Sequence, residues 1–118
     1  MSIRFDLITI DTPDTERLAR FWRTALALIE VEREDVDRWI VLADADGTRR
    51  IGLQRGESRR GGLHLDLACD AGSFGAEVER LVGLGATLLR PVRVEPYGSI
   101  ANLADPDGNA FDLCAYVH

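Results

Sequence analysis

The stretch Leu103-Ala104-Asp105-Pro106-Asp107-Gly108 repeats an earlier stretch, Leu42-Ala43-Asp44-Ala45-Asp46-Gly47, at five of six positions. Asp and Gly in this spacing form tight turns between neighbouring strands. Strand-like runs lie before the two copies, at residues 38–42 and 99–103, and after them, at residues 50–54 and 110–116. The repeated stretch predicts two hairpins of the same design. Taken alone, it also fits two unrelated hairpins that share a turn type.

The segments in front of the two hairpins correspond as well. Residues 3–10 are rich in apolar and β-branched side chains, and a helix is expected from Asp14 onward, where apolar residues recur at helical spacing. Residues 63–69 alternate with a period of two, and a second helix closed by Gly85 is expected after them. The sequence therefore predicts an α+β fold of two βαβββ modules, residues 1–55 and 63–118, joined by a Gly- and Arg-rich linker at 56–62.

The composition is that of an ordinary globular domain and excludes several function classes. The 118 residues carry 14 basic side chains, all of them Arg, and 20 acidic ones, for a net charge of −6. An acidic balance argues against a nucleic-acid partner, because phosphate binding needs a basic face. No apolar run approaches the roughly 20 residues of a membrane span, so we expect no membrane partner and a cytoplasmic location. Cys69 and Cys114 are expected to be buried thiols rather than a disulfide or a zinc site.

Four segments carry a resemblance to a known family, namely residues 14–22, His64-Leu65-Asp66-Leu67, Leu84-Gly85-Ala86 and residues 104–113 with their Asp-Pro-Asp-Gly-Asn turn. With them the chain resembles the vicinal oxygen chelate superfamily, which includes glyoxalase I, extradiol dioxygenases and bleomycin and fosfomycin resistance proteins. It is most similar to the short glyoxalase-like domain members. The resemblance implies a cup-shaped mixed β-sheet with the helices outside, a ligand cavity in the cup, and a homodimer.

Metal-using members of that superfamily place four ligands in the cup, one on the first and one on the last strand of each half. In the second half the resemblance puts His64 at the His position and Asp112 where metal-binding relatives have Glu. Alternation along the strand places His64 and Asp66 on one face and the leucines on the other. If the leucines pack on the helix, His64 and Asp66 look into the cup.

The first half departs from this pattern. An offset of 58 residues maps His64 onto Asp6, and a slip of one residue selects Leu7 instead. The position of Asp112 corresponds to Gly52, with Gln54 as a remote substitute. The candidate metal ligands are therefore Asp6, His64 and Asp112, for a divalent Zn, Ni, Mn or Fe ion. Because half of the ligand positions depart from the pattern, we expect that a metal is not obligatory.

The favoured function is the binding of a small molecule in the cup, as in bleomycin resistance proteins. The alternatives are a metal-dependent lyase, isomerase or dioxygenase, in which Asp66 is the spare carboxylate for moving a proton, and a purely structural or regulatory module. Apolar pockets with a few polar anchors are typical ligand sites. The candidate ligand-binding residues are His64, Asp66, Asp112, Trp39, Tyr97 and Phe111; for each aromatic residue core packing is the alternative, and His64 could equally be a hydrogen-bonded histidine.

Overall fold

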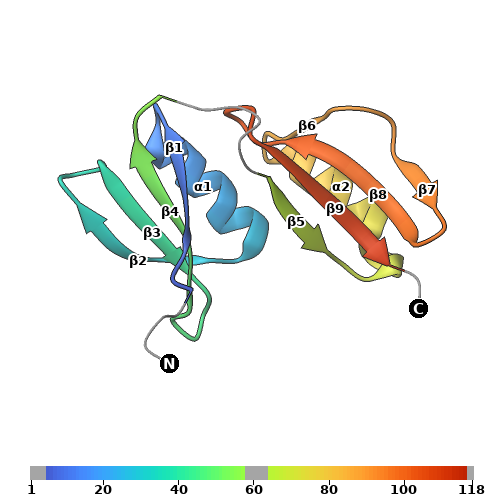
Figure 1. Ribbon diagram of the computed structural model, residues 1–118, viewed down its shortest axis with the longest axis horizontal. Coiled ribbons are helices and arrows are strands. Elements are labelled where there is room, and N and C mark those ends of the chain that lie inside the picture. The colour runs from blue at the N-terminus through green and yellow to red at the C-terminus, as the bar shows by residue number, and fades with distance from the viewer. Residues whose placement is uncertain (1–4, 58–63, 117–118) are drawn as a thin grey trace. The chain divides into compact units, whose positions relative to one another are not determined.

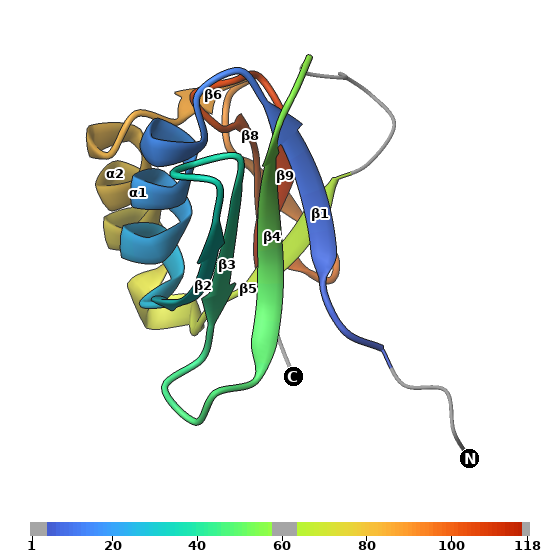
Figure 2. The same ribbon diagram turned by 90° about the vertical axis from the view of Figure 1, so that its left-hand side faces the viewer.

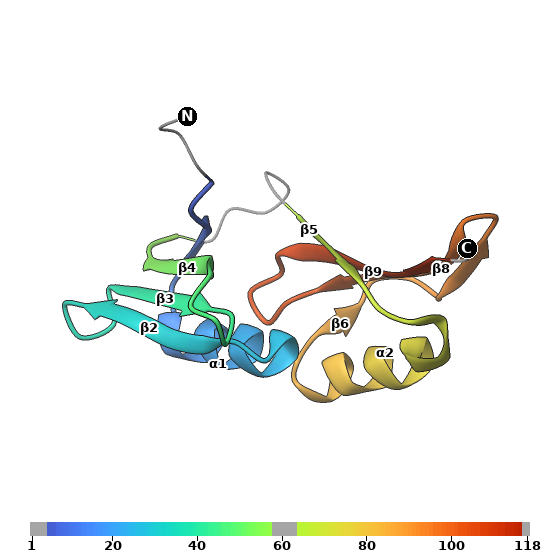
Figure 3. The ribbon, with the colours of Figure 1, turned by 90° about the horizontal axis from the view of Figure 1, so that it is seen from below.

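The computed structural model describes residues 5–57 and 64–116, and the chain divides into two compact units, Met1–Ser58 and Arg59–His118 (Figure 1). Each unit holds one small β-sheet and one main helix, which covers one face of its own sheet (Figure 3). The predicted α+β class is confirmed. Most of the predicted linker 56–62 lies outside the described residues, and the shared hollow between the sheets stays a prediction.

The first unit follows the predicted order of strand, helix and three strands. Its sheet has the strand order β1-β4-β3-β2, and β1 runs parallel to β4 (Figure 2). The elements are β1 (Ile8–Thr12), α1 (Thr15–Leu26), β2 (Ile29–Glu34), β3 (Trp39–Ala43) and β4 (Arg49–Arg55). Helix α1 begins where predicted, because the Asp14 side chain caps it by accepting a hydrogen bond from the Arg17 backbone N–H at 3.1 Å.

The core of the first unit lies between α1 and the middle of its sheet. Helix α1 packs on β3 and β4. Both Leu18 and Trp22 of the helix are buried, and so are the sheet residues Ile40, Leu42 and Leu53. Because side chains alternate along a strand, the residues between these buried ones face away from the helix. We call that side, in either unit, the helix-free face of the sheet.

The second unit has the same plan with a broken edge. Its sheet has the order β5-β9-β8-β6, with β7 also paired to β8 and β5 parallel to β9. The elements are β5 (Leu65–Ala68), a 3-10 turn η1 (Ala71–Ser73), α2 (Phe74–Gly83), β6 (Thr87–Leu88), β7 (Arg93–Glu95), β8 (Gly98–Ala104) and β9 (Ala110–Tyr116). Pro91, which has no N–H to donate, lies in the gap between β6 and β7.

Two predicted pieces of turn chemistry are confirmed. In both Asp-x-Asp-Gly turns the glycine N–H donates to the carbonyl of the first Asp, Gly47 to Asp44 at 2.9 Å and Gly108 to Asp105 at 2.8 Å. Both glycines have φ +89°, which an L side chain rarely adopts. After α2, Gly85 has φ +119° and donates to Val82, while the next N–H donates to Leu81. This is the two-bond helix ending that favours glycine.

Neither cysteine forms a disulfide. Cys114 is buried, whereas Cys69 is half-buried, so the expectation of two buried thiols holds fully only for Cys114. Burial raises the pKa of the Cys69 thiol. Among the described residues, no helix has both the length and the apolar character that crossing a bilayer requires.

Candidate functional site

The helix-free face of the second sheet carries a row of polar side chains. In the register of the sheet, Asp112 of β9 lies opposite Asp66 of β5 on one side and opposite Asn102 of β8 on the other. Paired residues share a face, so the three side chains are neighbours. His64, two residues before Asp66, alternates to the same face. The residues on either side of Asp112, Phe111 and Leu113, are buried.

Three of these side chains form a compact donor group. One ligand atom each of His64, Asp66 and Asp112 lie within 4.8 Å of one another. His64 Nε2 is 3.5 Å from an oxygen of Asp66, and these two side chains are 56% and 70% exposed. Asp112 is half-buried. The sequence named all three as candidates, and the structure brings them together.

Asn102 holds Asp112 and links it to two arginines. Its side-chain N–H2 donates to Asp112 Oδ1 at 2.7 Å. Its carbonyl oxygen accepts from Arg90 Nε at 2.8 Å and from Arg93 Nη2 at 3.0 Å. Because guanidinium groups only donate and an ionised carboxylate only accepts, this amide can satisfy both neighbours in one orientation only. The result is a polar chain that runs from two cations through one amide to the carboxylate.

The donor group fits a divalent cation. Carboxylate oxygens and a neutral imidazole are ligands that Zn²⁺ and Mn²⁺ accept. Ligand atoms on one such ion are about 3–4 Å apart, a little less than the spread of this group, so the three atoms would have to move slightly closer together to share one ion. The exposure of His64 and Asp66 leaves space for water or ligand oxygens on the same ion. A cation there also offsets the repulsion between the two carboxylates.

The corresponding positions of the first sheet are different. Gly52 of β4 lies opposite Thr9 of β1 and Val41 of β3, as Asp112 lies opposite Asp66 and Asn102. Counting back two residues from Thr9 reaches Leu7, so the register places Leu7, and not Asp6, at the position of His64. Asp6 forms an ion pair with Arg49 at 2.9 Å. The alignment of Gly52 with Asp112 agrees with the sequence analysis.

Side chains fill the place that a ligand at Gly52 would need. A Cβ added to Gly52 would lie 2.3 Å from Trp39 Cη2 and 3.1 Å from Leu7 Cδ1. The Trp39 indole N–H donates to Glu32 at 2.6 Å, and Arg49 donates to the same carboxylate at 3.0 Å. The hydrogen bond from Trp39 and then the one from Arg49 hold the pKa of Glu32 below its usual value. We call Leu7, Gly52 and Trp39 the aromatic plug of the first sheet.

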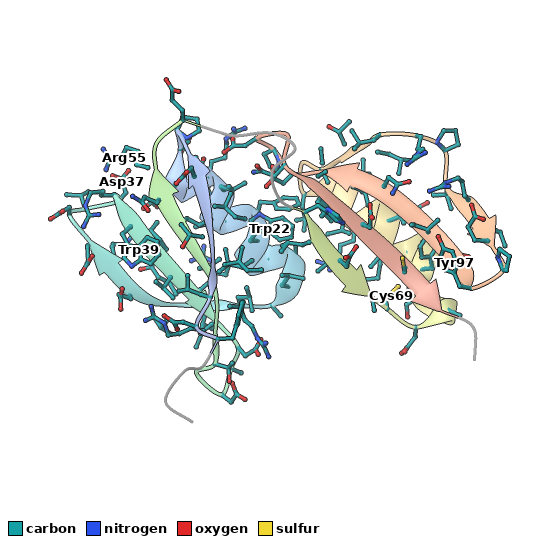
Figure 4. All side chains as sticks on the ribbon, in the orientation of Figure 1. Trp22, Asp37, Trp39, Arg55, Cys69 and Tyr97 are labelled. Atoms are coloured by element: carbon teal, nitrogen blue, oxygen red, sulfur yellow. The ribbon has the colours of Figure 1, made fainter. Side chains whose placement is uncertain are left out.

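The aromatic candidates for ligand binding lie in three different settings. Trp39 belongs to the aromatic plug of the first unit (Figure 4). Tyr97 lies in the turn between β7 and β8 and is 45% exposed (Figure 4). Phe111 is completely buried in the core of the second unit, which is the packing role that the sequence also allowed.

Sequence reasoning missed Asn102, Arg90 and Arg93. A signal for Asn102 was available, because the turn at Asp105–Gly108 sets the hairpin register and so pairs residue 102 with residue 112. Arg90 and Arg93 gave no such signal, because they belong to the irregular edge around Pro91 and reach Asn102 only through long side chains.

No curated protein matches the sequence. A glyoxalase-related enzyme from Fulvimarina pelagi is 26% identical, with a TM-score of 0.76 over 95% of this chain and 87% of its own. A glyoxalase/bleomycin resistance protein/dioxygenase family enzyme from Burkholderia phytofirmans PsJN is 20% identical, with a TM-score of 0.80 over 95% and 98%.

The fosfomycin resistance protein FosX from Listeria monocytogenes, solved with Mn(II) and a sulfate ion, is 21% identical, with a TM-score of 0.78 over 99% of this chain and 92% of its own. These likenesses confirm the fold that the resemblance to the vicinal oxygen chelate superfamily implies. At the level of families, the Glyoxalase-like domain matches residues 7–114. That match covers almost the whole chain, and the protein therefore belongs to the glyoxalase-like domain family.

Proposed function

We propose that this chain binds a small, oxygen-rich molecule on the helix-free face of its second sheet. The observation that carries the proposal is the grouping of His64, Asp66 and Asp112 within 4.8 Å. His64 and Asp66 are both more than half exposed, so a ligand can reach their polar atoms. The first sheet supports the choice of the second sheet, because in the first sheet the aromatic plug fills the corresponding positions.

A second candidate function is activity that depends on a divalent cation. Two observations favour it: the donor group fits such an ion, and a structural neighbour was solved with Mn(II). In this chain His64, Asp66 and Asp112 would hold the ion, which supplies Lewis-acid chemistry when bound. Asn102 keeps one oxygen of Asp112 occupied and so fixes the direction of the carboxylate. Asp66, the most exposed of the three, is the carboxylate best placed to exchange a proton with solvent.

Other site predictions from the sequence remain proposals. Tyr97 is a candidate ligand contact because nearly half of its surface is exposed. Asp6 remains a candidate ligand only if it gives up its ion pair with Arg49. The homodimer and the cytoplasmic location also remain predictions.

A cation titration separates the two candidate functions. The chain, treated with chelator and then freed of it, is titrated with Zn²⁺ and with Mn²⁺ while backbone amide signals are recorded by NMR. If a cation binds at the donor group, Zn²⁺ shifts and Mn²⁺ broadens the signals of Asp66 and Asp112 first. We expect His64→Ala to weaken this binding at least tenfold, since one of three protein ligands is lost.

A matched control removes a charge from the same unit away from the donor group. Glu79 is exposed on α2, and Glu79→Gln changes the net charge as Asp112→Asn does. If Glu79→Gln and Asp112→Asn weaken cation binding equally, the binding depends only on the net charge of the chain, and the second candidate is contradicted. Binding of small hydroxy and keto compounds without any cation, lost in Asp112→Asn, would support the first candidate alone. If neither cations nor such compounds perturb β5, β8 or β9, the proposed function is wrong.

A further inference from the structure

We propose that Arg90 and Arg93 form a subsite for an oxyanion, a carboxylate or phosphoryl group, beside the His64–Asp66–Asp112 donor group. The inference rests on the proposed function and narrows its substrate class. The ligand would be a small anion whose acidic group meets the arginines while its other oxygen atoms meet the donor group. The contacts, the unused donors and the position of the two arginines support this subsite.

The first observation is that two guanidinium groups converge on a single neutral acceptor. Arg90 and Arg93 both donate to the carbonyl oxygen of Asn102. Two positive charges at one amide repel each other, and a nearby anion offsets this repulsion. Arg93 has a partial counter-charge in Glu95 at 3.1 Å. For Arg90, no carboxylate within ion-pair distance belongs to the part of the chain that the structure describes.

The second observation is that the pair has unused donors. An arginine offers five N–H donors in a planar fork. In the described residues, Arg90 uses only Nε, which leaves both terminal nitrogens without an acceptor. The Nε atom of Arg93 is buried and also lacks an acceptor among the described residues. A buried donor without a partner is costly, and an oxyanion supplies several acceptors at once.

The third observation is the position of the pair. Only the side-chain amide of Asn102 separates the two guanidinium groups from the carboxylate of Asp112. A ligand that spans this amide would meet the guanidinium groups with its acidic group and the donor group with its other oxygen atoms. Guanidinium groups bind carboxylate and phosphoryl oxygens in a two-point geometry. Their charge also offsets the repulsion that Asp66 and Asp112 exert on an anion.

The test compares two probes of almost equal size. Glycolate carries a hydroxyl group next to a carboxylate, and glycolamide carries the same hydroxyl next to a neutral amide. Each is titrated into the intact chain, and backbone amide and arginine side-chain signals are followed by NMR. We expect glycolate to shift the Arg90 Nε–H signal and to bind at least tenfold more tightly than glycolamide. Phosphoglycolate, titrated in parallel, tells whether the subsite prefers a phosphoryl group or a carboxylate.

Variants assign the effect to the arginines. Arg90→Gln, at an exposed position, is expected to remove the preference for glycolate over glycolamide. Arg80→Gln is the matched control, because Arg80 lies on α2 and pairs with Glu77. It should leave the preference unchanged. Raising the ionic strength from about 0.01 M to about 0.15 M, which shortens the Debye length from about 30 Å to about 8 Å, should weaken glycolate binding and not glycolamide binding.

Two outcomes would overturn the inference. If glycolate and glycolamide bind equally well at Asp66 and Asp112, and Arg90→Gln changes neither, the ligand site stands and the oxyanion subsite does not. If neither glycolate nor phosphoglycolate shifts any signal of β8 or of Arg90, the subsite is also excluded. The proposed function is then decided by the cation titration and the neutral compounds, which do not depend on Arg90.

Discussion

In each unit the strand that comes last along the chain, β4 or β9, carries a very different residue at the same position: Gly52 in the first unit and Asp112 in the second. Around Asp112 the neighbouring side chains are His64, Asp66 and Asn102, and they leave polar atoms exposed. Around Gly52 the Trp39 ring occupies the space of a side chain. One fold thus presents a polar, accessible face in one copy and a filled face in the other.

Folding constrains some parts of the repeat and leaves others free to vary. The turn chemistry and the apolar residues under the helix are shared by both units, because each sheet must bury one face to be stable. The helix-free faces do not pack on the helices, and there the two copies diverge. The comparison supports the proposal that the second unit binds the ligand, and exchanging residues between the units tests it.

The largest effect is expected from giving the first sheet the amide of the second. Val41 is fully buried and corresponds to Asn102. Val41→Asn loses the burial of an apolar side chain and buries an amide without partners, so it should lower the free energy of unfolding by about 3 kcal/mol or more. Urea denaturation measures the change. A cost near zero would mean that the first sheet accepts a polar site and that its filled face is incidental.

The next effect tests the aromatic plug directly. Gly52→Ala places a methyl group against the Trp39 ring, and we expect a loss of about 1–3 kcal/mol in the free energy of unfolding, as for other overpacked sites. In Trp39→Leu the same change should cost less, because the ring is gone. Gly75→Ala is the control, since nothing lies near its added Cβ and α2 should gain up to about 1 kcal/mol. A Gly52→Ala variant as stable as the parent chain would refute the close packing.

A smaller effect is expected from the reciprocal exchange in the second sheet. Asn102→Val removes the hydrogen bonds to Asp112 and to both arginines, but at a half-buried position where water can replace them. We expect a loss of about 1 kcal/mol in thermal or urea unfolding. The Arg90 Nε–H signal should move toward that of a free arginine. If Asn102→Val costs more than Val41→Asn, the comparison between the faces is reversed.

The smallest effect is a change in pH dependence. The hydrogen bond from Trp39 keeps the pKa of Glu32 below its ordinary value of 4.5. A carboxyl group whose pKa is lower in the folded chain stabilises the fold above the unfolded-state pKa and loses that contribution as the pH falls through the folded-state value. The free energy of unfolding of the parent chain should therefore fall more steeply with acid, below about pH 4.5, than that of Glu32→Gln. Parallel profiles would mean that the indole does not favour the charged carboxylate.

Most of the fold could be predicted because local signals and long-range register agree. The two Asp-x-Asp-Gly turns set both hairpins, and Gly85 ends α2 as expected. Period-two alternation placed His64 and Asp66 on one face, and the parallel pairing of β5 with β9 places Asp112 beside them. The split of the edge strand into β6 and β7 was not foreseen, although Pro91 is a sufficient physical cause.

The site was harder to predict where the answer depends on one residue of register or on side-chain reach. A slip of one residue turns a strand over, so the alignment of the two halves of the sequence left both Asp6 and Leu7 open as the counterpart of His64. The pairing of β1 with β4 makes Leu7 that counterpart. The plug over Gly52 depends on the direction of the Trp39 ring. The convergence of Arg90 and Arg93 on Asn102 depends on how far two long side chains extend, and the periodicity of the sequence does not indicate that.

The distribution of aromatic residues has a practical consequence for experiments on this chain. Both tryptophans, Trp22 and Trp39, belong to the first unit, and both tyrosines, Tyr97 and Tyr116, belong to the second. Intrinsic indole emission therefore reports on one half of the molecule alone, while far-ultraviolet circular dichroism reports on both. Midpoints that coincide would show that the halves melt as one cooperative body, and midpoints that separate would reveal a half-folded intermediate without any added label.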